Sequence, residues 1–230
     1  MRRQPCGPLS KPDLQERAPS MTKIKICGIT NEQDALWAVN LGADFIGLNF
    51  YAQSPRKVSP KNAKDIAGKL PPFVVPVGVF VDADAKSILK LVSSTPLKFA
   101  QLHGNESPDV CREIKAAGAG VIKVISLSAA LNPADWNAYA EFVDYFLIDN
   151  GTGDAPGGTG QTFDWAWLET APQLGKPWFL AGGLNPDNVA EGIKKSHPFA
   201  VDVCSGIERL PTRKDFEAMK KFIQNVRGVK

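Results

Sequence analysis

A thiol and a carboxylate stand at the carboxyl ends of two apolar runs, where each suits proton transfer. Cys27 closes the run Ile24–Cys27 just before Gly28, and Asp149 closes the run Tyr145–Asp149. A cysteine acts as a base at neutral pH once its pKa falls below about 8.5. A carboxyl group that is poorly solvated on one side has a raised pKa, which suits it to donate a proton. The two residues predict general acid–base chemistry if the fold brings them together.

Each residue also has a structural interpretation that the sequence leaves open. A single cysteine is more often a packing residue than a base, and an aspartate after a strand often braces the next loop. Lys25 lies on the same side of its strand as Cys27 by alternation, so its ammonium group could lower the pKa of the thiol. Cys111 and Cys204 are predicted to be small buried hydrophobic residues.

Two glycine turns point to an anion. Gly182-Gly183 and Ser205-Gly206 follow the last two apolar runs of the chain. Glycine lets a ligand approach the backbone closely, and N–H groups near a helix amino end can bind phosphate oxygens. A tight turn alone would explain either pair, but the presence of both favours a phosphate site.

Three further features are candidates for substrate contact. Arg56 offers a planar fork for a carboxylate or a phosphate, unless it is simply a surface arginine beside Pro55. His103 is either a ligand contact or a neutral brace under the site, and the brace is slightly favoured. The segment 150–162 contains five glycines, which predicts a lid over the substrate or, alternatively, a plain surface connection.

Eight apolar runs position these residues. They are Ile24–Cys27, Phe45–Phe50, Val74–Val81, Phe99–His103, Val121–Ser126, Tyr145–Asp149, Trp178–Ala181 and Ala200–Cys204. Helical patterns of about ten residues separate them, which predicts an α/β fold with a parallel sheet. Eight strands favour a single closed (β/α)8 TIM barrel over a doubly wound open sheet, which usually has five or six. In a barrel the carboxyl ends of all strands share one rim.

Capping residues mark the predicted helix starts. Thr30 with Gln33 has the spacing of a capping box. Elsewhere a capping residue precedes a proline of the first turn. These pairs are Ser59-Pro60, Ser107-Pro108, Asn132-Pro133 and Asn185-Pro186.

Composition and charge narrow the class of protein. The chain has 230 residues, 43% hydrophobic and 22% charged, with a formal charge of +3, so no nucleic-acid surface is predicted. No apolar run is long enough for a membrane span or a secretory signal, which makes the cytoplasm the default location. The cysteines and the two histidines are not spaced as metal ligands. Residues 1–20 contain four prolines and predict a disordered leader before a barrel domain at 21–230.

Several of these segments together closely resemble the phosphoribosylanthranilate isomerase family of tryptophan biosynthesis. They are KICGIT, SPRKVS, GVFV, QLHG, LIDN, GGTGQTFDW, LAGGLNPDNV and VDVCSGIE, in the family's order from about residue 21 onward. The resemblance implies an Amadori rearrangement of N-(5′-phosphoribosyl)anthranilate to 1-(2-carboxyphenylamino)-1-deoxyribulose 5-phosphate. It implies no cofactor and no metal, a small phosphosugar substrate, and a monomer or a homodimer.

The resemblance also implies roles for individual residues. Cys27 matches the family's base and Asp149 its acid. Arg56 would face the anthranilate carboxylate, and the two glycine turns would hold the phosphate. Asp202 and His103 would contact the substrate or brace the mouth of the barrel.

Two other functions would share part of this pattern. Another phosphosugar isomerase, such as the aminoaldose isomerase of histidine synthesis, is expected to use two aspartates, whereas Cys27 occupies the first position here. A non-catalytic phosphosugar-binding module would keep the glycine turns but have no use for Cys27 and Asp149. Lys57 and Cys204 depart from the family's commonest pattern, in which an aromatic residue and a serine are frequent.

Overall fold

The computed structural model describes residues 21–126, 133–149 and 175–229 of the chain. The barrel strands are β1 (Lys23–Ile26), β2 (Phe45–Asn49), β3 (Val75–Phe80), β4 (Phe99–Leu102), β5 (Gly120–Ser126), β6 (Tyr145–Asp149), β7 (Trp178–Leu180) and β8 (Ala200–Val203). Each strand pairs in parallel with the next, and β8 pairs with β1, so the sheet closes. The predicted (β/α)8 barrel is confirmed and the open sheet is excluded. The predicted leader and the glycine-rich segment at 150–162 lie outside the described residues.

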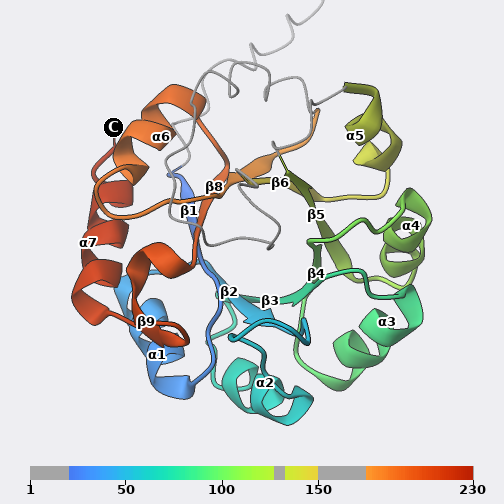
Figure 1. Cartoon of the computed structure of the whole chain (residues 1–230), viewed down its shortest axis with the longest axis horizontal. Helices are drawn as coiled ribbons and strands as arrows, with labels where there is room; N and C mark the ends of the chain where they lie inside the picture. Colours follow the sequence, from blue (N-terminus) through green and yellow to red (C-terminus); the bar gives the residue numbers. More distant parts are fainter. Residues whose placement is uncertain (1–20, 127–132, 150–174, 230) are drawn as a thin grey trace, which may run out of the picture.

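Helices surround the barrel, and one follows most of the strands (Figure 1). They are α1 (Glu32–Leu41), α2 (Pro60–Ala67), α3 (Ala85–Ser94), α4 (Pro108–Ala116), α5 (Pro133–Ala140), α6 (Val189–Ser196) and α7 (Phe216–Arg227). After β8 the chain forms a short 3-10 helix, η2 (Ser205–Ile207), and an antiparallel ribbon of β9 (Glu208–Leu210) and β10 (Arg213–Lys214). The described helices do not combine the length and apolar character needed to cross a membrane.

The amino end of α1 differs from the prediction by one residue. Asn31 is the cap, because its Oδ1 accepts a hydrogen bond from the backbone N–H of Asp34 at 2.9 Å. Thr30 instead donates its hydroxyl to the backbone carbonyl of Thr212 at 2.9 Å. The predicted capping box is wrong because asparagine is itself a strong cap and stands one residue nearer to the helix.

The other predicted caps have mixed outcomes. Ser59 caps α2 as predicted, with its Oγ accepting a backbone N–H at 3.1 Å. α6, however, begins at Val189 behind Asn188, and not directly after Asn185. The Oδ1 of Asn185 accepts the N–H groups of Asp187 and Asn188 at 2.8 and 3.2 Å. Asn185 therefore closes a turn that leads from β7 toward the helix.

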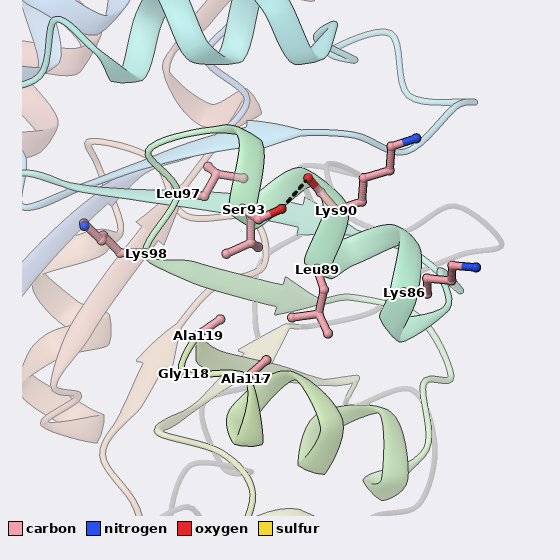
Figure 2. A pocket seen from close by; sticks show the side chains of 10 residues that line it. Lys86, Leu89, Lys90, Ser93, Leu97, Lys98, Ala117, Gly118 and Ala119 are labelled. Atoms are coloured by element: carbon pink, nitrogen blue, oxygen red, sulfur yellow. Dashed lines mark hydrogen bonds between the residues drawn. The ribbon is translucent and has the colours of Figure 1, made fainter.

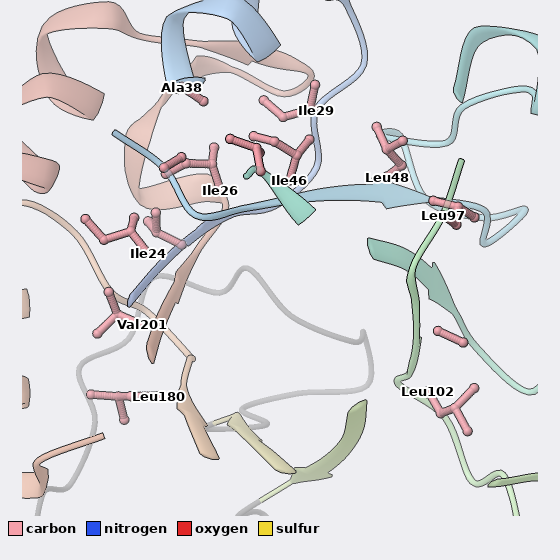
Figure 3. Close-up of a cluster of buried hydrophobic side chains, with 14 of the residues drawn as sticks. Ile24, Ile26, Ile29, Ala38, Ile46, Leu48, Leu97, Leu102, Leu180 and Val201 are labelled. Atoms are coloured by element: carbon pink, nitrogen blue, oxygen red, sulfur yellow. The ribbon is translucent and has the colours of Figure 1, made fainter. Parts of the chain in front are cut away.

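Strand alternation divides the interior of the molecule into two layers. Ile24 and Ile26 of β1 point outward and pack near Ala38 of α1 and Ile46 of β2 (Figure 3). Lys25, which lies between them, points into the barrel, because successive side chains of a strand face opposite sides. Burial of the outer layer holds the helices on the barrel through the hydrophobic effect. It also fixes which residues of each strand face the barrel axis.

Aromatic rings fill the inside of the barrel near the beginnings of its strands. Phe179 lies edge-on to Phe45 and to Tyr145, with ring centroids 5.2 and 5.3 Å apart, and Tyr145 stacks on Phe199 at 5.0 Å. These residues belong to a buried cluster that is separate from the outer layer. This aromatic cluster closes the end of the barrel at which the strands begin. The polar side chains that point into the barrel therefore lie toward its other end.

A surface hollow of about 600 Å³ lies between α3 and α4 (Figure 2). Its described lining comprises lysines such as Lys86 and Lys90, small residues and the apolar side chains of Leu89 and Leu97. No carboxylate, thiol or imidazole belongs to this lining, so the hollow offers no group for acid–base chemistry. The chemistry gathers at the strand ends instead.

Candidate active site

All of the site residues predicted from the sequence line one cavity at the carboxyl ends of the strands. These residues are Cys27, Arg56, His103, Asp149, Gly182, Gly183, Asp202, Ser205 and Gly206. They come from elements far apart along the chain and meet because parallel strands end at the same rim. Asn49, Gln101 and Cys204, for which no substrate contact was predicted, also belong to the lining.

A buried ion pair lies one step below this rim. Lys25 of β1 faces Asp202 of β8 in register, with Nζ 2.9 Å from Oδ1, and both side chains are at least nine-tenths buried. Burial raises the pKa of Asp202 to about 7, and the charge of Lys25 opposes part of that rise. For Lys25 itself the carboxylate outweighs burial, so its pKa lies above the ordinary value. A charged ammonium group therefore stays beneath the cavity.

The thiol of Cys27 sits directly above this pair, where glycine on the next strand leaves room. A Cβ at Gly47 would lie 2.7 Å from Sγ of Cys27, closer than real Cβ contacts allow, and 3.2 Å from Nζ of Lys25, which is a tight contact. Lys25 lies on the same side of β1 as Cys27, as alternation predicts, and its charge opposes part of the rise in the pKa of Cys27 that the bond to Cys204 and burial produce. Gly47 is thus part of the cradle for the sulfur.

Cys204 forms a thiol pair with Cys27, contrary to the prediction that it only packs. The register of Ile26 with Val203 places the two cysteines opposite each other at the ends of β1 and β8. A side-chain hydrogen bond between them lowers the pKa of Cys204 to about 6, supported by the charges of Lys214 and Arg56. The same bond, with burial, raises the pKa of Cys27. At neutral pH the pair therefore holds one proton and one negative charge.

Arg56 reaches the cavity as part of an ion network that the sequence reasoning missed. Glu208 accepts hydrogen bonds from Nε and Nη2 of Arg56 at 2.9 and 2.7 Å, and from Nζ of Lys214 at 2.9 Å. Nζ of Lys214 also bonds to the carbonyl of Cys204 at 2.9 Å. Among the described residues, Nη1 of Arg56 keeps no hydrogen-bond partner, so one edge of the guanidinium is open to a ligand. The glutamate closing VDVCSGIE was the available signal for this network.

Asp149 ends β6 at the cavity beside an imidazole. Its Oδ2 lies 3.4 Å from Nε2 of His103, and Nδ1 of that ring lies 3.4 Å from Nε2 of Gln101. The brace interpretation of His103 fits this geometry, although the ring also lines the cavity. Oε1 of Gln101 is buried and has no hydrogen-bond partner among the described residues. A substrate hydroxyl would satisfy it.

The two glycine turns abut each other at the ends of β7 and β8, the strands that lie between β6 and β1 in the barrel. Gly182 and Gly183 have φ of +83° and +70°, a left-handed conformation that other residues adopt at a cost. A Cβ at Gly206 would lie 2.0 Å from the carbonyl oxygen of Leu184, so the loops after β7 and β8 can touch only through glycine. This arrangement of two glycine turns, the glycine cradle, has the form of backbone sites that can bind an anion.

Fold and site together define a class of protein. A closed (β/α)8 barrel with a thiol pair, buried carboxylates and a glycine cradle at its carboxyl rim is a TIM-barrel enzyme for proton transfer on an anionic substrate. Comparison with known proteins gives the family, because a family model described as N-(5′-phosphoribosyl)anthranilate (PRA) isomerase matches residues 24–225. The chain belongs to the phosphoribosylanthranilate isomerase family, and its activity is an isomerisation in tryptophan biosynthesis.

Individual relatives agree with this assignment. An N-(5′-phosphoribosyl)anthranilate isomerase of Acidithiobacillus ferrooxidans is 46% identical over 90% of this chain and 98% of its own length. A structure described as monomers of the dimeric isomerase from Thermotoga maritima superposes with a TM-score of 0.78 at 40% identity, covering 90% and 100% of the two chains. A second, complexed with reduced 1-(o-carboxyphenylamino)-1-deoxyribulose 5-phosphate, has the same TM-score, identity and coverage.

Proposed function

We propose that Asp149 is the general acid and Cys27 the general base of this isomerase. The observation that carries the assignment is that both groups line one cavity together with the glycine cradle. A phosphate held at the cradle fixes the sugar between a carboxyl group on β6 and a sulfur on β1. The rival phosphosugar isomerase and the non-catalytic module lose their support, since family membership assigns this reaction.

The reaction follows as two proton transfers. Asp149 gives its proton to the ring oxygen of the aminofuranose, and the C1–O bond breaks to leave an open-chain Schiff base. The thiolate of Cys27 then takes the proton from C2, and the electron pair moves to the imine nitrogen. The resulting enolamine tautomerises to the ketone product. Each positioned acid or base contributes about 10²–10⁴-fold to such a rate.

Charge on the thiol pair makes Cys27 competent as a base. The pair holds one proton at neutral pH, and the shared proton can rest on Cys204 while Cys27 carries the charge. The bond between the sulfurs and burial place the proton on Cys27 at rest, and the charge of Lys25 beneath Cys27 opposes that preference, which favours transfer of the proton to Cys204. Asp202 keeps Lys25 in place through their 2.9 Å contact.

The remaining groups bind the substrate in this proposal. Arg56 offers its open edge to the anthranilate carboxylate, while Glu208 orients the guanidinium. The turns at Gly182-Gly183 and Ser205-Gly206 hold the phosphate through backbone N–H groups. His103 orients the carboxyl group of Asp149, because its ring nitrogen lies 3.4 Å away.

Asp202 is the alternative acid, because its pKa of about 7 suits proton donation and it lines the same cavity. Its contact with Lys25 argues for a supporting role, since an acid in the reaction must face the sugar. Asp149→Asn and Asp202→Asn separate the two assignments. We expect Asp149→Asn to lose ring opening and to keep its fold. Asp202→Asn, in contrast, is expected to lower the free energy of unfolding.

Turnover of freshly made phosphoribosylanthranilate, read as loss of its fluorescence, tests the assignments. Cys27→Ala and Asp149→Asn are each expected to lose at least about 10²-fold in kcat. Both should still bind inorganic phosphate as a competitive ligand and keep the circular-dichroism spectrum of the parent protein. Near-normal turnover by either variant would remove that residue from its role.

The partners in the cell are also proposals. The cavity binds a phosphosugar in this proposal, and the support is the relative solved with reduced 1-(o-carboxyphenylamino)-1-deoxyribulose 5-phosphate. Assembly as a homodimer has the dimeric Thermotoga maritima relative as its support, and a monomer is the alternative. A cytoplasmic location fits biosynthetic chemistry, and light scattering and fractionation test these two points.

A further inference from the structure

The sulfurs of Cys27 and Cys204 occupy neighbouring positions across the seam where the barrel closes. The N–H of Cys27 donates to the carbonyl of Val203 at 2.9 Å, so the strands remain paired up to the two cysteines. Opposed residues of paired strands lie about 5 Å apart at Cα, within the roughly 4.4–6.8 Å that a disulfide spans. A Cβ at Gly28, which follows Cys27, would lie 2.8 Å from Sγ of Cys204, so that sulfur reaches over the end of β1.

We propose that Cys27 and Cys204 are an oxidation site, at which a peroxide links them reversibly and thereby switches off the isomerase. The switching part rests on the proposed role of Cys27 as the base. Both thiols line the substrate cavity, so a small oxidant reaches them by the substrate's own route. The link needs no strand to move past another, because the register already sets the cysteines opposite each other.

The surroundings of Cys204 make it the first sulfur to react. Nζ of Lys214 lies 3.8 Å from its Sγ, and Arg56 adds a second positive charge. The thiolate is the nucleophilic form of cysteine, and nearby cations stabilise it. The pKa of Cys204, about 6, keeps this thiol ionised at neutral pH. Cys111 contrasts with this, because burial raises its pKa to about 11. Selectivity for the cavity pair follows from that difference.

The chemistry balances with a hydroperoxide as the two-electron oxidant. The thiolate of Cys204 attacks one oxygen of hydrogen peroxide, the O–O bond breaks, and Cys204 becomes a sulfenic acid while the other oxygen leaves as hydroxide, which takes a proton from solvent to become water. The sulfur of Cys27 then attacks Sγ of Cys204, the S–O bond breaks, and the oxygen leaves as water with the proton from Cys27. Two thiol sulfurs lose one electron each, and hydrogen peroxide becomes two waters. A small dithiol reverses the link by exchange.

Peptide mapping after stepwise addition of hydrogen peroxide to the full chain tests the site. A Cys6→Ser background removes the one cysteine that lies outside the described residues. We expect a linked peptide that contains Cys27 and Cys204 and is two hydrogens lighter than the separate peptides. Activity should fall in proportion to that link and return with dithiothreitol. Absence of the linked peptide while activity falls would overturn the proposal.

Two variants serve as matched controls. Cys204→Ser, compared with its own reduced rate, is expected to form no link and to show no loss that dithiothreitol reverses. Cys111→Ala should behave like the parent background in both measurements. Reversible inactivation of Cys204→Ser equal to that of the parent would reject the pair.

The outcomes also separate this inference from the proposed mechanism. A complete link that leaves turnover intact would remove Cys27 as the base and would contradict the switch, although the oxidation site would remain. Loss of turnover in Cys27→Ala without any link in the parent would reject the oxidation site alone.

Discussion

The thiols of Cys27 and Cys204 lie among the ammonium groups of Lys25 and Lys214 and the guanidinium of Arg56. Burial alone would keep both sulfurs protonated, because a charge in a low-dielectric interior is costly. The cations and the bond between the sulfurs offset that cost for one negative charge. In the mechanism we propose, the base is therefore the pair, whose titration is shared between its members.

The pH profile of kcat/KM is the first prediction at the residue scale. Because the pKa of Cys204 lies at about 6, the pair gains its second proton below that pH and loses its thiolate. The rate should therefore fall by about tenfold per pH unit on the acid side. In Cys204→Ser the charge must form on buried Cys27 alone, so the acid limb should move to higher pH. Stopped-flow fluorescence from pH 5 to 9 measures both profiles.

The control for this experiment is Cys111→Ala, which removes a buried thiol away from the cavity. Its acid limb should coincide with that of the parent protein. An unchanged limb in Cys204→Ser would show that Cys27 titrates independently and would contradict the shared charge.

A strand can also shape the site by leaving space for side chains of its neighbour. Gly47 of β2 provides the space for Sγ of Cys27 and Nζ of Lys25. Gly47→Ala should push the thiol from its position and lower kcat by about 10²-fold, because small misplacements of a reacting group are that costly. The inhibition constant for inorganic phosphate should not change, since the cradle lies on other strands.

Gly78→Ala is a matched control for this change. A Cβ there would meet Cδ1 of Leu97 at 2.9 Å, a contact nearly as close as the 2.7 Å contact at Gly47 but outside the site. It should lower the free energy of unfolding without the loss in kcat. Equal kcat values for Gly47→Ala and Gly78→Ala would contradict the role of the space below Cys27.

The glycine cradle gives a second prediction at the scale of elements. Gly182 after β7 and Gly118 after α4 have nearly the same φ, +83° and +85°. Alanine at either should lower the free energy of unfolding by about 1–2 kcal/mol, the cost of a left-handed residue. Only Gly182→Ala should also weaken inorganic phosphate, by about tenfold, the equivalent of one lost hydrogen bond to an anion. Competition kinetics and urea unfolding measure the two effects.

Much of the fold and the rim could be predicted because both depend on local patterns. β6 matches its predicted span, since an aromatic and β-branched run ends abruptly at Asp149. The ion network of Arg56, Glu208 and Lys214 could not be predicted in the same way. Lys214 and Glu208 lie on the ribbon after β8, and no periodicity says where that ribbon folds back. Cys204 was misjudged although alternation from Asp202 turns it inward.

At the scale of the whole molecule, one side chain adds to the β8–β1 pairing by joining the last described helix to the segments at the start of β1 and β2. Arg227 at the end of α7 donates from Nη1 to the carbonyl of Thr22 at 2.8 Å and from Nη2 to that of Gly42 at 2.9 Å. Its Nη2 also contacts Asp44, which accepts the N–H of Ile24 at the start of β1. α7 packs between α1 and α6, so this residue closes the ring of helices beside the seam (Figure 1).

Arg227→Ala should therefore destabilise the closure while sparing the chemistry, which lies at the other end of the strands. Loss of hydrogen bonds from a charged, partly exposed donor costs about 2 kcal/mol, or about 4–8 °C in Tm for a chain of this size. Differential scanning calorimetry measures the shift, and kcat at 25 °C should stay at the parent value. Lys220→Ala on the same helix removes an exposed cation 4.0 Å from Glu217 and should leave Tm unchanged. A Tm for Arg227→Ala equal to that of Lys220→Ala would show that packing alone closes the barrel.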